Sequence, residues 1–310
     1  MTSAEVIGQP FVSVVIPVYN DAEGIRMTLE SVIDQTYSHE AYEILAVDNN
    51  SNDGTRTVIE KYCERYPDLV QLAVEDERQG QSAALNKGIQ HAHGSLIAFI
   101  DADMTVERTW LEDITKAMSE HDVEYLGCNV NIYIPEGEET YTARYNKISG
   151  FPMGEYIKSS HFVGSGCLVV TRNLINEVGP FNGNLDFSFD REFGNRVHAA
   201  GFDQHFESDI VMSHPARTSL RSLLSKSIRT GRGKTHLKQR YPERFETRSL
   251  SDPRNYLPLH PVRFLSRMMG DNDISMDELI VLYLIGCLSK LVRNLSAVYE
   301  QFQSNSSKNG

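Results

Sequence analysis

The chain has 310 residues, of which 40% are hydrophobic and 23% are charged, and its formal net charge is −12. These values are typical of a folded globular protein and exclude fibrous and intrinsically disordered classes. The negative charge also argues against a general nucleic-acid-binding protein, because phosphate backbones select basic surfaces. The length suits one large α/β domain with an extension, or two small domains.

The charge is unevenly distributed along the chain. Between Pro215 and Phe245 there are nine Lys or Arg residues and a single acid, Glu243. A basic segment within an acidic protein indicates a local anionic partner, which is either a phosphate group or a lipid headgroup.

The cysteines and the apolar segments bear on the compartment. The four cysteines fit no metal-ligand spacing, which indicates free thiols in a reducing compartment; they are Cys63, Cys128, Cys167 and Cys287. The first ten residues lack the basic and apolar regions of a signal peptide. The longest apolar run, residues 279–285, is far shorter than the roughly 20 residues that span a bilayer. We therefore expect a cytoplasmic protein, or one that lies peripherally on the cytoplasmic face of a membrane.

Short apolar runs alternate with amphipathic stretches over the first hundred residues. Strands are expected at 11–16, 43–47, 69–74 and 95–100, with helices after residue 21, after residue 54 and at 82–91. This alternation predicts a mainly parallel, Rossmann-like sheet flanked by helices, in which ligands bind beyond the carboxyl ends of the strands. Polar residues cluster at those ends, at 19–21, 48–53, 78–81 and 101–103. Four loops should therefore converge on one cleft.

The alternation weakens after Trp110. Strands are expected at 125–134 and 166–170, helices at 192–200 and 218–229, a linker at 249–261 and a final helix from Ser275, where Ser275 and Glu278 form a capping box. We therefore predict a catalytic domain over 1–245, with a nucleotide-binding half at about 10–104 and an acceptor half at about 105–245. A C-terminal helical extension over 246–310 should end in a disordered tail.

Asp101-Ala102-Asp103 closes the fourth expected strand. Two carboxylates one residue apart repel each other, and a divalent cation removes that cost. Hard Mg²⁺ or Mn²⁺ is usually held by one or two carboxylates together with phosphate oxygens. The pattern therefore predicts a divalent-cation site at Asp103 and Asp101.

Four blocks in this order resemble the family 2 glycosyltransferases, which have a GT-A fold. The blocks are VSVVIPVYNDAEGIRMTLESVIDQT, ILAVDNNSNDGT, QGQSAALNKGI and LIAFIDAD, and they cover about residues 11–103. The resemblance implies an inverting transferase that moves a sugar from a nucleotide diphosphate donor to an acceptor hydroxyl with the help of Mn²⁺ or Mg²⁺. The Gln-x-x-Arg-Trp signature of processive synthases is absent, which favours a single transfer.

The resemblance also assigns the nucleotide site. The matching positions are Pro17, Tyr19, Asp48, Asn49, Arg78, Asp101 and Ala102. Asn49 stands where the family usually has a second aspartate, and an amide both donates and accepts hydrogen bonds whereas a carboxylate only accepts them. UDP remains the favoured nucleotide over GDP or dTDP. Restoring the family pair with Asn49→Asp is expected to keep or improve the affinity for UDP.

A later block around Asp190 supplies the expected catalytic base. Asp190 matches the family's catalytic aspartate, with Arg196 and Gly201 in register. The base would take the proton of the acceptor hydroxyl as its oxygen attacks the anomeric carbon. Asp190 could instead cap the following helix, and Asp186 is the rival base.

Three further groups of residues complete the predicted site. His214 would join Asp103 and Asp101 at the metal or diphosphate. Arg229 and Arg232 flank a flexible Gly-rich segment that could close over the diphosphate as a lid. The acceptor side would be formed by Gly164, Ser165 and Glu192.

Two alternatives to a transferase stay open on the sequence alone: a sugar-phosphate nucleotidyltransferase, and a catalytically degenerate GT-A protein that acts as a binding or scaffold subunit. The expected partners are a nucleotide-sugar donor and a glycan, lipid-linked or small-molecule acceptor, with no nucleic acid. The basic helix and the final helix also permit contact with a membrane surface, or a homodimer through the final helix.

Overall fold

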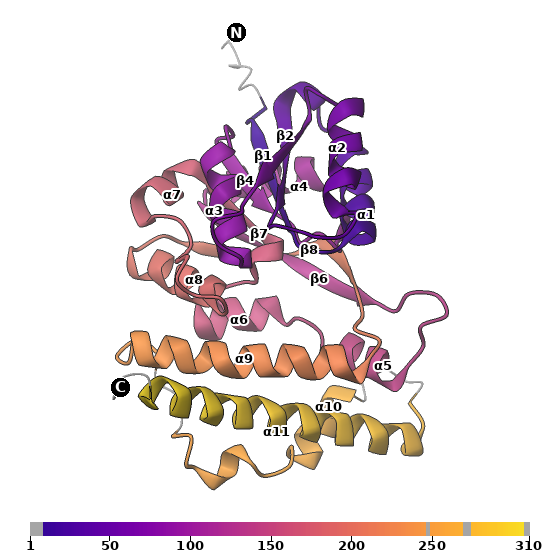
Figure 1. Cartoon of the computed structure of the whole chain (residues 1–310), viewed down its shortest axis with the longest axis vertical. Helices are drawn as coiled ribbons and strands as arrows, with labels where there is room; N and C mark the ends of the chain where they lie inside the picture. Colours follow the sequence, from indigo (N-terminus) through magenta and orange to yellow (C-terminus); the bar gives the residue numbers. More distant parts are fainter. Residues whose placement is uncertain (1–8, 246–248, 269–273, 307–310) are drawn as a thin grey trace. The chain divides into compact units, whose positions relative to one another are not determined.

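The computed structural model describes residues 9–245, 249–268 and 274–306 (Figure 1). These residues form one mixed sheet of eight strands with flanking helices, which confirms the α/β class. The strands are β1 (Val12–Val18), β2 (Tyr42–Asp48), β3 (Val70–Val74), β4 (Leu96–Phe99), β5 (Thr105–Val106), β6 (Tyr125–Tyr133), β7 (Leu168–Thr171) and β8 (Gln204–Pro215). Their order in the sheet is β3-β2-β1-β4-β7-β6-β8-β5.

The helices follow the order expected for an alternating fold. The first four are α1 (Ala22–Ile33), α2 (Thr55–Arg65), α3 (Gln81–His91) and α4 (Trp110–Glu120). The rest are α5 (Tyr141–Ser149), α6 (Met153–Ser160), α7 (Arg172–Val178), α8 (Phe189–Ala199), α9 (Leu220–Arg240), α10 (Pro261–Met268) and α11 (Met276–Ser306). Short 3₁₀ helices are η1 (His39–Ala41), η2 (Ser165–Cys167) and η3 (Pro253–Asn255).

Parallel pairing runs through the first half of the sheet. β1 pairs in parallel with β2 and β4, and β2 pairs in parallel with β3. Every residue of β1 and β2 is buried, as expected for strands covered on both faces. β7 pairs antiparallel with both β4 and β6, and β5 pairs antiparallel with β8. The predicted parallel sheet is therefore confirmed for β3-β2-β1-β4, and antiparallel pairs follow at β4-β7, β7-β6 and β8-β5.

Two helix starts are capped by side chains. Asp21 caps α1, because its Oδ1 accepts a hydrogen bond from Gly24 N at 2.9 Å. Ser275 caps α11 through a hydrogen bond of 3.4 Å from Glu278 N to its Oγ. The second hydrogen bond of the expected capping box would run from Ser275 N to the Glu278 side chain. Glu278 Oε1 instead pairs with Arg144 Nε at 3.0 Å.

The chain forms two compact units. The first unit comprises Met1–Val130, Pro152–Gly183 and Phe189–Ser213, and the second comprises Asn131–Phe151, Asn184–Ser188 and His214–Gly310. All the residues of the predicted site belong to the first unit except His214, Arg229 and Arg232.

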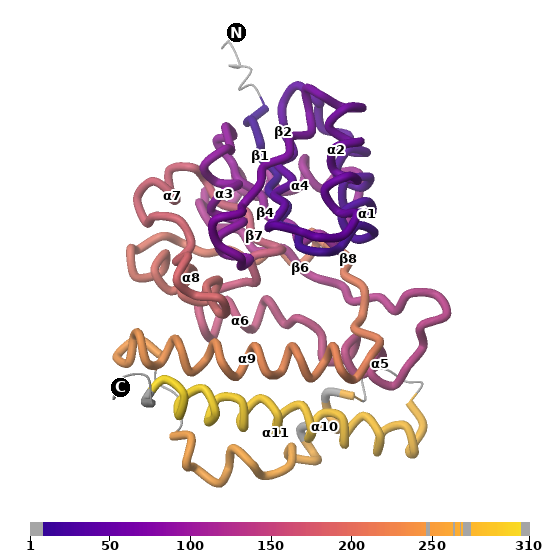
Figure 2. The backbone as a smooth tube through the Cα atoms, viewed as in Figure 1, coloured from indigo at the N-terminus to yellow at the C-terminus, as the bar shows by residue number. Residues whose placement is uncertain are grey.

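In the second unit α9 and α11 run side by side (Figure 2). They are parallel, because Ser296 Oγ donates to Ile228 O and Thr235 Oγ1 donates to Ala297 O. Gly231 lies so close to the backbone of Arg293 that a methyl group there would overlap it. The expectation of a flexible loop at 230–233 is therefore wrong, since these residues lie inside α9 and pack against a second helix.

The C-terminal segment also differs from the sequence prediction. The expected linker at 249–261 contains η3, and the first residue of α10 is Pro261. α11 extends to Ser306, so the tail predicted as disordered begins inside a helix. Residues 307–310 of that tail lie outside the described residues, as do the first eight residues of the chain. By length and composition α11 could cross a membrane. The sequence analysis considered only the longest uninterrupted apolar run and so did not identify α11 as long and apolar enough to cross a membrane. Gly286 and Ser289 interrupt the apolar stretch of this helix.

Candidate active site

Hydrogen bonds link the four loops at the carboxyl ends of the parallel strands. The Asn20 side chain accepts from Asn52 N at 2.8 Å and joins the first loop to the second. Gly80 N donates to Asn49 Oδ1 at 2.6 Å and joins the second loop to the third. Gln81 Nε2 donates to Asp101 Oδ1 at 2.8 Å and joins the third to the fourth. The predicted convergence of these loops is confirmed.

Asp48 organises the second loop. This fully buried carboxylate accepts from Ser51 N at 3.0 Å and from Arg56 Nε at 2.8 Å, and it forms an ion pair with Arg56 Nη2 at 2.6 Å. A buried carboxylate is stable when it is paired and hydrogen-bonded in this way. Its contacts hold the loop that leads into α2.

Asn49 holds the third loop through both ends of its amide. Besides accepting from Gly80 N, it donates from Nδ2 to Glu75 O at 3.2 Å and to Arg78 O at 3.0 Å. Its side chain is buried, so the two N–H groups of the amide are used within the protein. Asn49 therefore positions the segment that carries Arg78, whose own side chain is exposed.

The other residues assigned to the nucleotide lie around the same edge of the sheet. Pro17 is buried within β1, Tyr19 is 48% exposed just after it, and Ala102 is buried between the two aspartates. An exposed aromatic ring at the end of a parallel strand is available for stacking on a planar base.

Negative charge accumulates around Asp103. Burial raises the pKa of Asp21 above its usual value, and the hydrogen bond from Gly24 N opposes this shift. The carboxylates of Asp103 and Asp53 raise the Asp21 pKa further, which shows that the three acids lie within electrostatic reach of one another. Carboxylate oxygens are the ligands that hard Mg²⁺ or Mn²⁺ prefers, and a divalent cation near Asp103 would offset this repulsion.

Asp101 rests against the backbone of η2. A methyl group on Gly166 would lie 2.5 Å from Asp101 Cγ and Oδ2, so only glycine permits this approach. Ser165 is buried in the same turn, and a methyl group on Gly164 would meet Met153 Cε at 3.1 Å. The turn that contains Gly164 and Ser165 therefore also supports the Asp101 carboxylate, through Gly166.

Asp190 also lies near the η2 turn. Burial raises the pKa of the Cys167 thiol well above its usual value, and the carboxylates of Asp101 and Asp190 both add to this effect. Cys167 is fully buried in η2, so the turn lies within electrostatic reach of both acids. Two acids that are 89 residues apart in sequence thus share one small region of the first unit.

Asp190 has the properties of a general base near neutral pH. It lies in the first turn of α8 and accepts a hydrogen bond from Arg191 N at 2.7 Å. Burial raises its pKa to about 6, against the opposing effects of that hydrogen bond and the Arg191 charge. A carboxyl group with a pKa of about 6 is largely ionised at pH 7 and still accepts a proton readily.

Glu192 is engaged in a structural contact. It is 2% exposed and pairs with Arg196 through a hydrogen bond of 2.9 Å from Nε to Oε1. Arg196 Nη2 donates at 2.7 Å to Pro180 O in the segment that follows α7. This ion pair ties α8 to the end of α7, and it directs the Glu192 carboxylate toward arginine.

The remaining predicted residues belong to the second unit. His214 is buried, its Nδ1 lies 2.6 Å from Pro215 O, and its ring lies 5.5 Å from that of Phe151. In the chain it follows Ser213, the residue of β8 that pairs with Thr105. Arg229 is exposed on α9, and Arg232 pairs with Glu300 of α11 at 3.2 Å.

The sequence analysis did not single out three residues that build this site. Gln81 orients Asp101, Gly166 makes room for it, and Arg56 neutralises Asp48. Gln81 and Gly166 both lie inside segments that the sequence had marked as polar or small loops. The contact partner of each could not be read from the sequence, because the partners are distant along the chain.

Comparisons with known proteins agree with this geometry. The family model described as glycosyl transferase family 2 matches residues 13–179. Glycosyltransferase AglE of Haloferax volcanii is 38% identical over 224 residues, which are 72% of this chain and 73% of that protein.

Two solved structures share the fold at lower sequence identity. The mannosyltransferase PcManGT of Pyrobaculum calidifontis, in complex with GDP-Man and Mn²⁺, has a TM-score of 0.66 at 20% identity, over 96% of this chain and 88% of that one. S. aureus TarS 1–349, in complex with UDP-GlcNAc, has a TM-score of 0.55 at 16% identity, over 95% and 92%.

Proposed function

The chain belongs to glycosyl transferase family 2, and from this we propose that it catalyses an inverting, metal-dependent transfer of one sugar from a UDP-sugar to an acceptor hydroxyl. One observation carries the proposal: Asp101 and Asp190 both lie within electrostatic reach of the η2 turn. The proposal assigns donor binding to Asp101 and acceptance of the proton to Asp190, two acids near one small-residue turn.

The chemical step that we propose is a single displacement at the anomeric carbon. Asp190 accepts the proton of the acceptor hydroxyl while its oxygen forms the new glycosidic bond. The bond between the anomeric carbon and the diphosphate breaks, and its electron pair leaves with the diphosphate. Attack from the face opposite the leaving group inverts the configuration of that carbon.

Asp101 and Asp103 are the residues that would hold the divalent cation. When bound, the cation would neutralise the charge that develops on the departing diphosphate. The hydrogen bond from Gln81 and the contact with Gly166 fix the Asp101 carboxylate, so its orientation does not have to be acquired on binding. The Gly164–Ser165 backbone is the surface that we assign to the acceptor.

The nucleotide base has two candidates. The match to the family's nucleotide positions supports UDP, as does the UDP-GlcNAc complex of TarS. The GDP-Man complex of the mannosyltransferase, which has the higher TM-score, favours GDP as the second candidate. The chain's own loop contacts, through Asn49 and Arg78, are compatible with either base.

A thermal-stability panel tests the donor and the metal together. UDP, GDP and dTDP are each added with Mn²⁺ or with EDTA, since a ligand that binds only the native state raises Tm. UDP at 100 times its Kd should stabilise the protein by about 2.7 kcal/mol, and only with Mn²⁺. Asp103→Ala should remove the shift while the exposed control Asp68→Ala keeps it. Equal Tm shifts with EDTA and with Mn²⁺ refute the metal dependence. A larger Tm shift with GDP than with UDP makes GDP the nucleotide of the donor.

We also propose that α11 rests on an anionic membrane surface, which would suit a lipid-linked acceptor. Its exposed large apolar side chains recur every three or four residues, so they lie on one face of the helix: Met276, Ile280, Leu284, Leu288, Leu291, Leu295, Tyr299 and Phe302. Within the described residues, this face spans nearly the whole helix and exceeds the scattered apolar exposure normal for a monomer.

The neighbouring helix supplies the matching charge. α9 packs along α11 and contains seven Lys or Arg residues and no acid. Basic residues beside an apolar face are typical of helices that lie in the plane of an anionic bilayer. Because the cations of α9 cannot be buried in hydrocarbon at low cost, α11 lies on the membrane and does not cross it.

Flotation with phosphatidylglycerol-containing vesicles tests this docking. The wild type should float and Leu284→Glu/Leu291→Glu should not, whereas Tyr141→Glu, at an exposed tyrosine of α5 in the same unit, should float like the wild type. Absence of flotation of the wild type, together with a concentration-dependent dimer in light scattering, refutes the proposal and makes this face a homodimer interface.

A further inference from the structure

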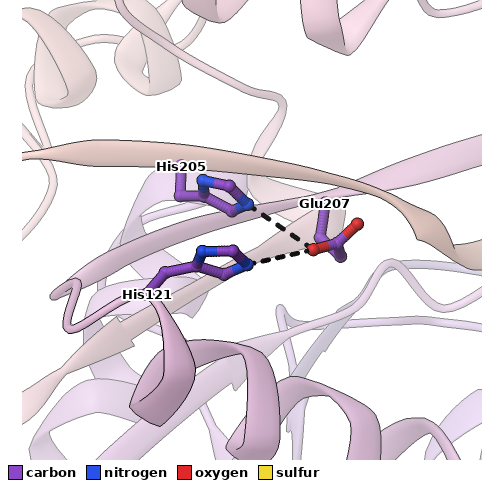
Figure 3. Close-up of side chains that lie close together, drawn as sticks. All are labelled: His121, His205 and Glu207. Atoms are coloured by element: carbon purple, nitrogen blue, oxygen red, sulfur yellow. Dashed lines mark ion pairs between the residues drawn. The ribbon is translucent and has the colours of Figure 1, made fainter.

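A second cluster of metal-ligating side chains lies in the first unit, away from Asp101 and Asp103. It consists of His121, His205 and Glu207, which offer ligand atoms within 4.8 Å of one another (Figure 3). His121 ends α4 as its C-terminal capping residue. His205 and Glu207 lie two residues apart on β8, and side chains at that spacing point to the same face of a strand.

The three side chains converge on one point. Glu207 Oε2 lies 3.3 Å from His121 Nε2 and 3.5 Å from His205 Nε2. Figure 3 shows both imidazole rings presenting a nitrogen to the same carboxylate oxygen. The other oxygen, Oε1, accepts from Asp209 N at 3.4 Å, which leaves Oε2 directed at the histidines.

These distances are those of a tetrahedral site. Zn²⁺ binds imidazole nitrogen at about 2.0–2.1 Å and carboxylate oxygen at about 2.0–2.2 Å, so two ligand atoms of one tetrahedron lie roughly 3.4 Å apart. The measured separations of 3.3 and 3.5 Å bracket that value. The two rings are stacked, with centroids 3.7 Å apart, so both must turn substantially out of the stack for their lone pairs to face a shared ion.

The cluster is separate from the proposed catalytic site. Ser213 of β8 pairs with Thr105, two residues after Asp103 in the chain. Glu207 lies six residues before Ser213 on the same strand, and a strand advances about 3.3 Å per residue, which separates the two places by roughly 20 Å. An ion at the cluster would therefore not touch the donor.

We propose that His121, His205 and Glu207 bind Zn²⁺ as a site that fastens the end of α4 to β8. Two imidazoles and one carboxylate form a donor set that zinc accepts, with water as the fourth ligand. Without the ion, α4 is joined to β8 here by one ion pair, between the exposed His121 and Glu207, and by the stacking of His121 on His205. The metal replaces them with coordinate bonds and stabilises the native state.

Zinc titration against a chromophoric chelator tests the site, with full-length protein freed of any histidine tag. The wild type should bind one Zn²⁺ at this site, and Asp103→Ala should keep that equivalent. His205→Ala and Glu207→Gln should each weaken the Kd by at least about 100-fold, because even the loss of an outer-shell partner typically costs 10–100-fold.

A matched control comes from a second stacked histidine pair. His161 and His198 stack with centroids 3.6 Å apart, and His198→Ala should leave the zinc Kd unchanged. Because Glu207→Gln retains a hydrogen-bonding side chain, it separates loss of a metal ligand from general unfolding, which circular dichroism monitors. If Glu207→Gln binds zinc as tightly as the wild type, or Asp103→Ala abolishes all zinc binding, the proposed site does not exist.

Discussion

Replacing Asp190 by asparagine removes a carboxylate from the first turn of α8 while keeping the size of the side chain. The amide oxygen can still accept the hydrogen bond from Arg191 N, so the local structure should persist. What is lost is the ability to take a proton. General-base catalysis typically supplies 10²–10⁴-fold, or about 3–5 kcal/mol of barrier. We expect kcat to fall by about that factor, and the Kd of the donor to stay nearly unchanged.

The pKa of Asp190 sets the pH dependence of the wild type. Burial raises this pKa to about 6, and only the ionised carboxylate can act as the base. The rate should therefore rise with pH through about 6 and level off above 7, where about nine-tenths of the groups are ionised. The rising limb should be absent from the residual activity of Asp190→Asn.

The same pKa predicts a change in stability that a purely structural acid would not produce. A carboxyl group whose folded-state pKa is raised stabilises the fold fully only below its unfolded pKa, near 4, and this contribution is lost as the pH rises through about 6. At pH 7 the ionised Asp190 therefore costs stability, at most about 3 kcal/mol. Asp190→Asn should unfold at a higher Tm than the wild type at pH 7, and the difference should shrink toward pH 4.

The assay is release of the nucleoside diphosphate from the donor that the stability panel identifies, with Asp186→Asn as the comparison. Asp186 is exposed and lies four residues earlier in the chain. If Asp186→Asn abolishes turnover while Asp190→Asn is nearly silent, the base is Asp186. If Asp190→Asn loses activity together with donor binding and Tm, the acid is structural and the reasoning is refuted.

Two further substitutions test the support of the donor site. Gly166→Ala should push the Asp101 carboxylate out of place and weaken Mn²⁺-dependent nucleotide binding at least about 10-fold in calorimetry. The control is Gly54→Ala, whose added methyl group meets nothing within 4 Å and which should bind the nucleotide normally. Equal affinities of the two variants would show that Asp101 needs no such support. Asn49→Asp should weaken nucleotide binding, because a carboxylate cannot donate to Glu75 O and Arg78 O; unchanged or improved UDP affinity would instead support the comparison with the family pair.

The revised expectation for Asn49 shows where sequence reasoning reaches its limit. The motif placed Asn49 in the second of the four converging loops, and the structure places it there. The substitution it suggested assumed that the amide faces the base. In the structure the amide faces the backbone of the next loop, a contact between residues about 26–31 positions apart that no local pattern encodes. The position of Asn49 in the fold was predictable from the sequence, but its hydrogen-bond partners were not.

The first half of the fold was predictable because its signals are local. Fully buried strands such as β1, followed by polar turns and amphipathic helices, leave little freedom in a parallel sheet. The Gly231–Gly233 segment gave the opposite result. Two glycines in four residues suggested a flexible lid, yet the tight contact between Gly231 and α11 requires glycine inside a helix. Whether a glycine supplies flexibility or close packing depends on what lies opposite it.

Asp101 and Asp103 are equivalent in the sequence motif, and the structure gives them different surroundings. Asp101 is held from two sides, by Gln81 Nε2 on Oδ1 and by the backbone of Gly166 against its Cγ. Asp103 acts on Asp21 through its charge, at the acidic side of the first loop. An acid whose orientation is fixed in advance contributes to catalysis by position, whereas an acid within a group of like charges contributes by attracting a cation that relieves their repulsion. Under the proposed function, the two aspartates would therefore divide between them the two requirements of donor binding, orientation and charge.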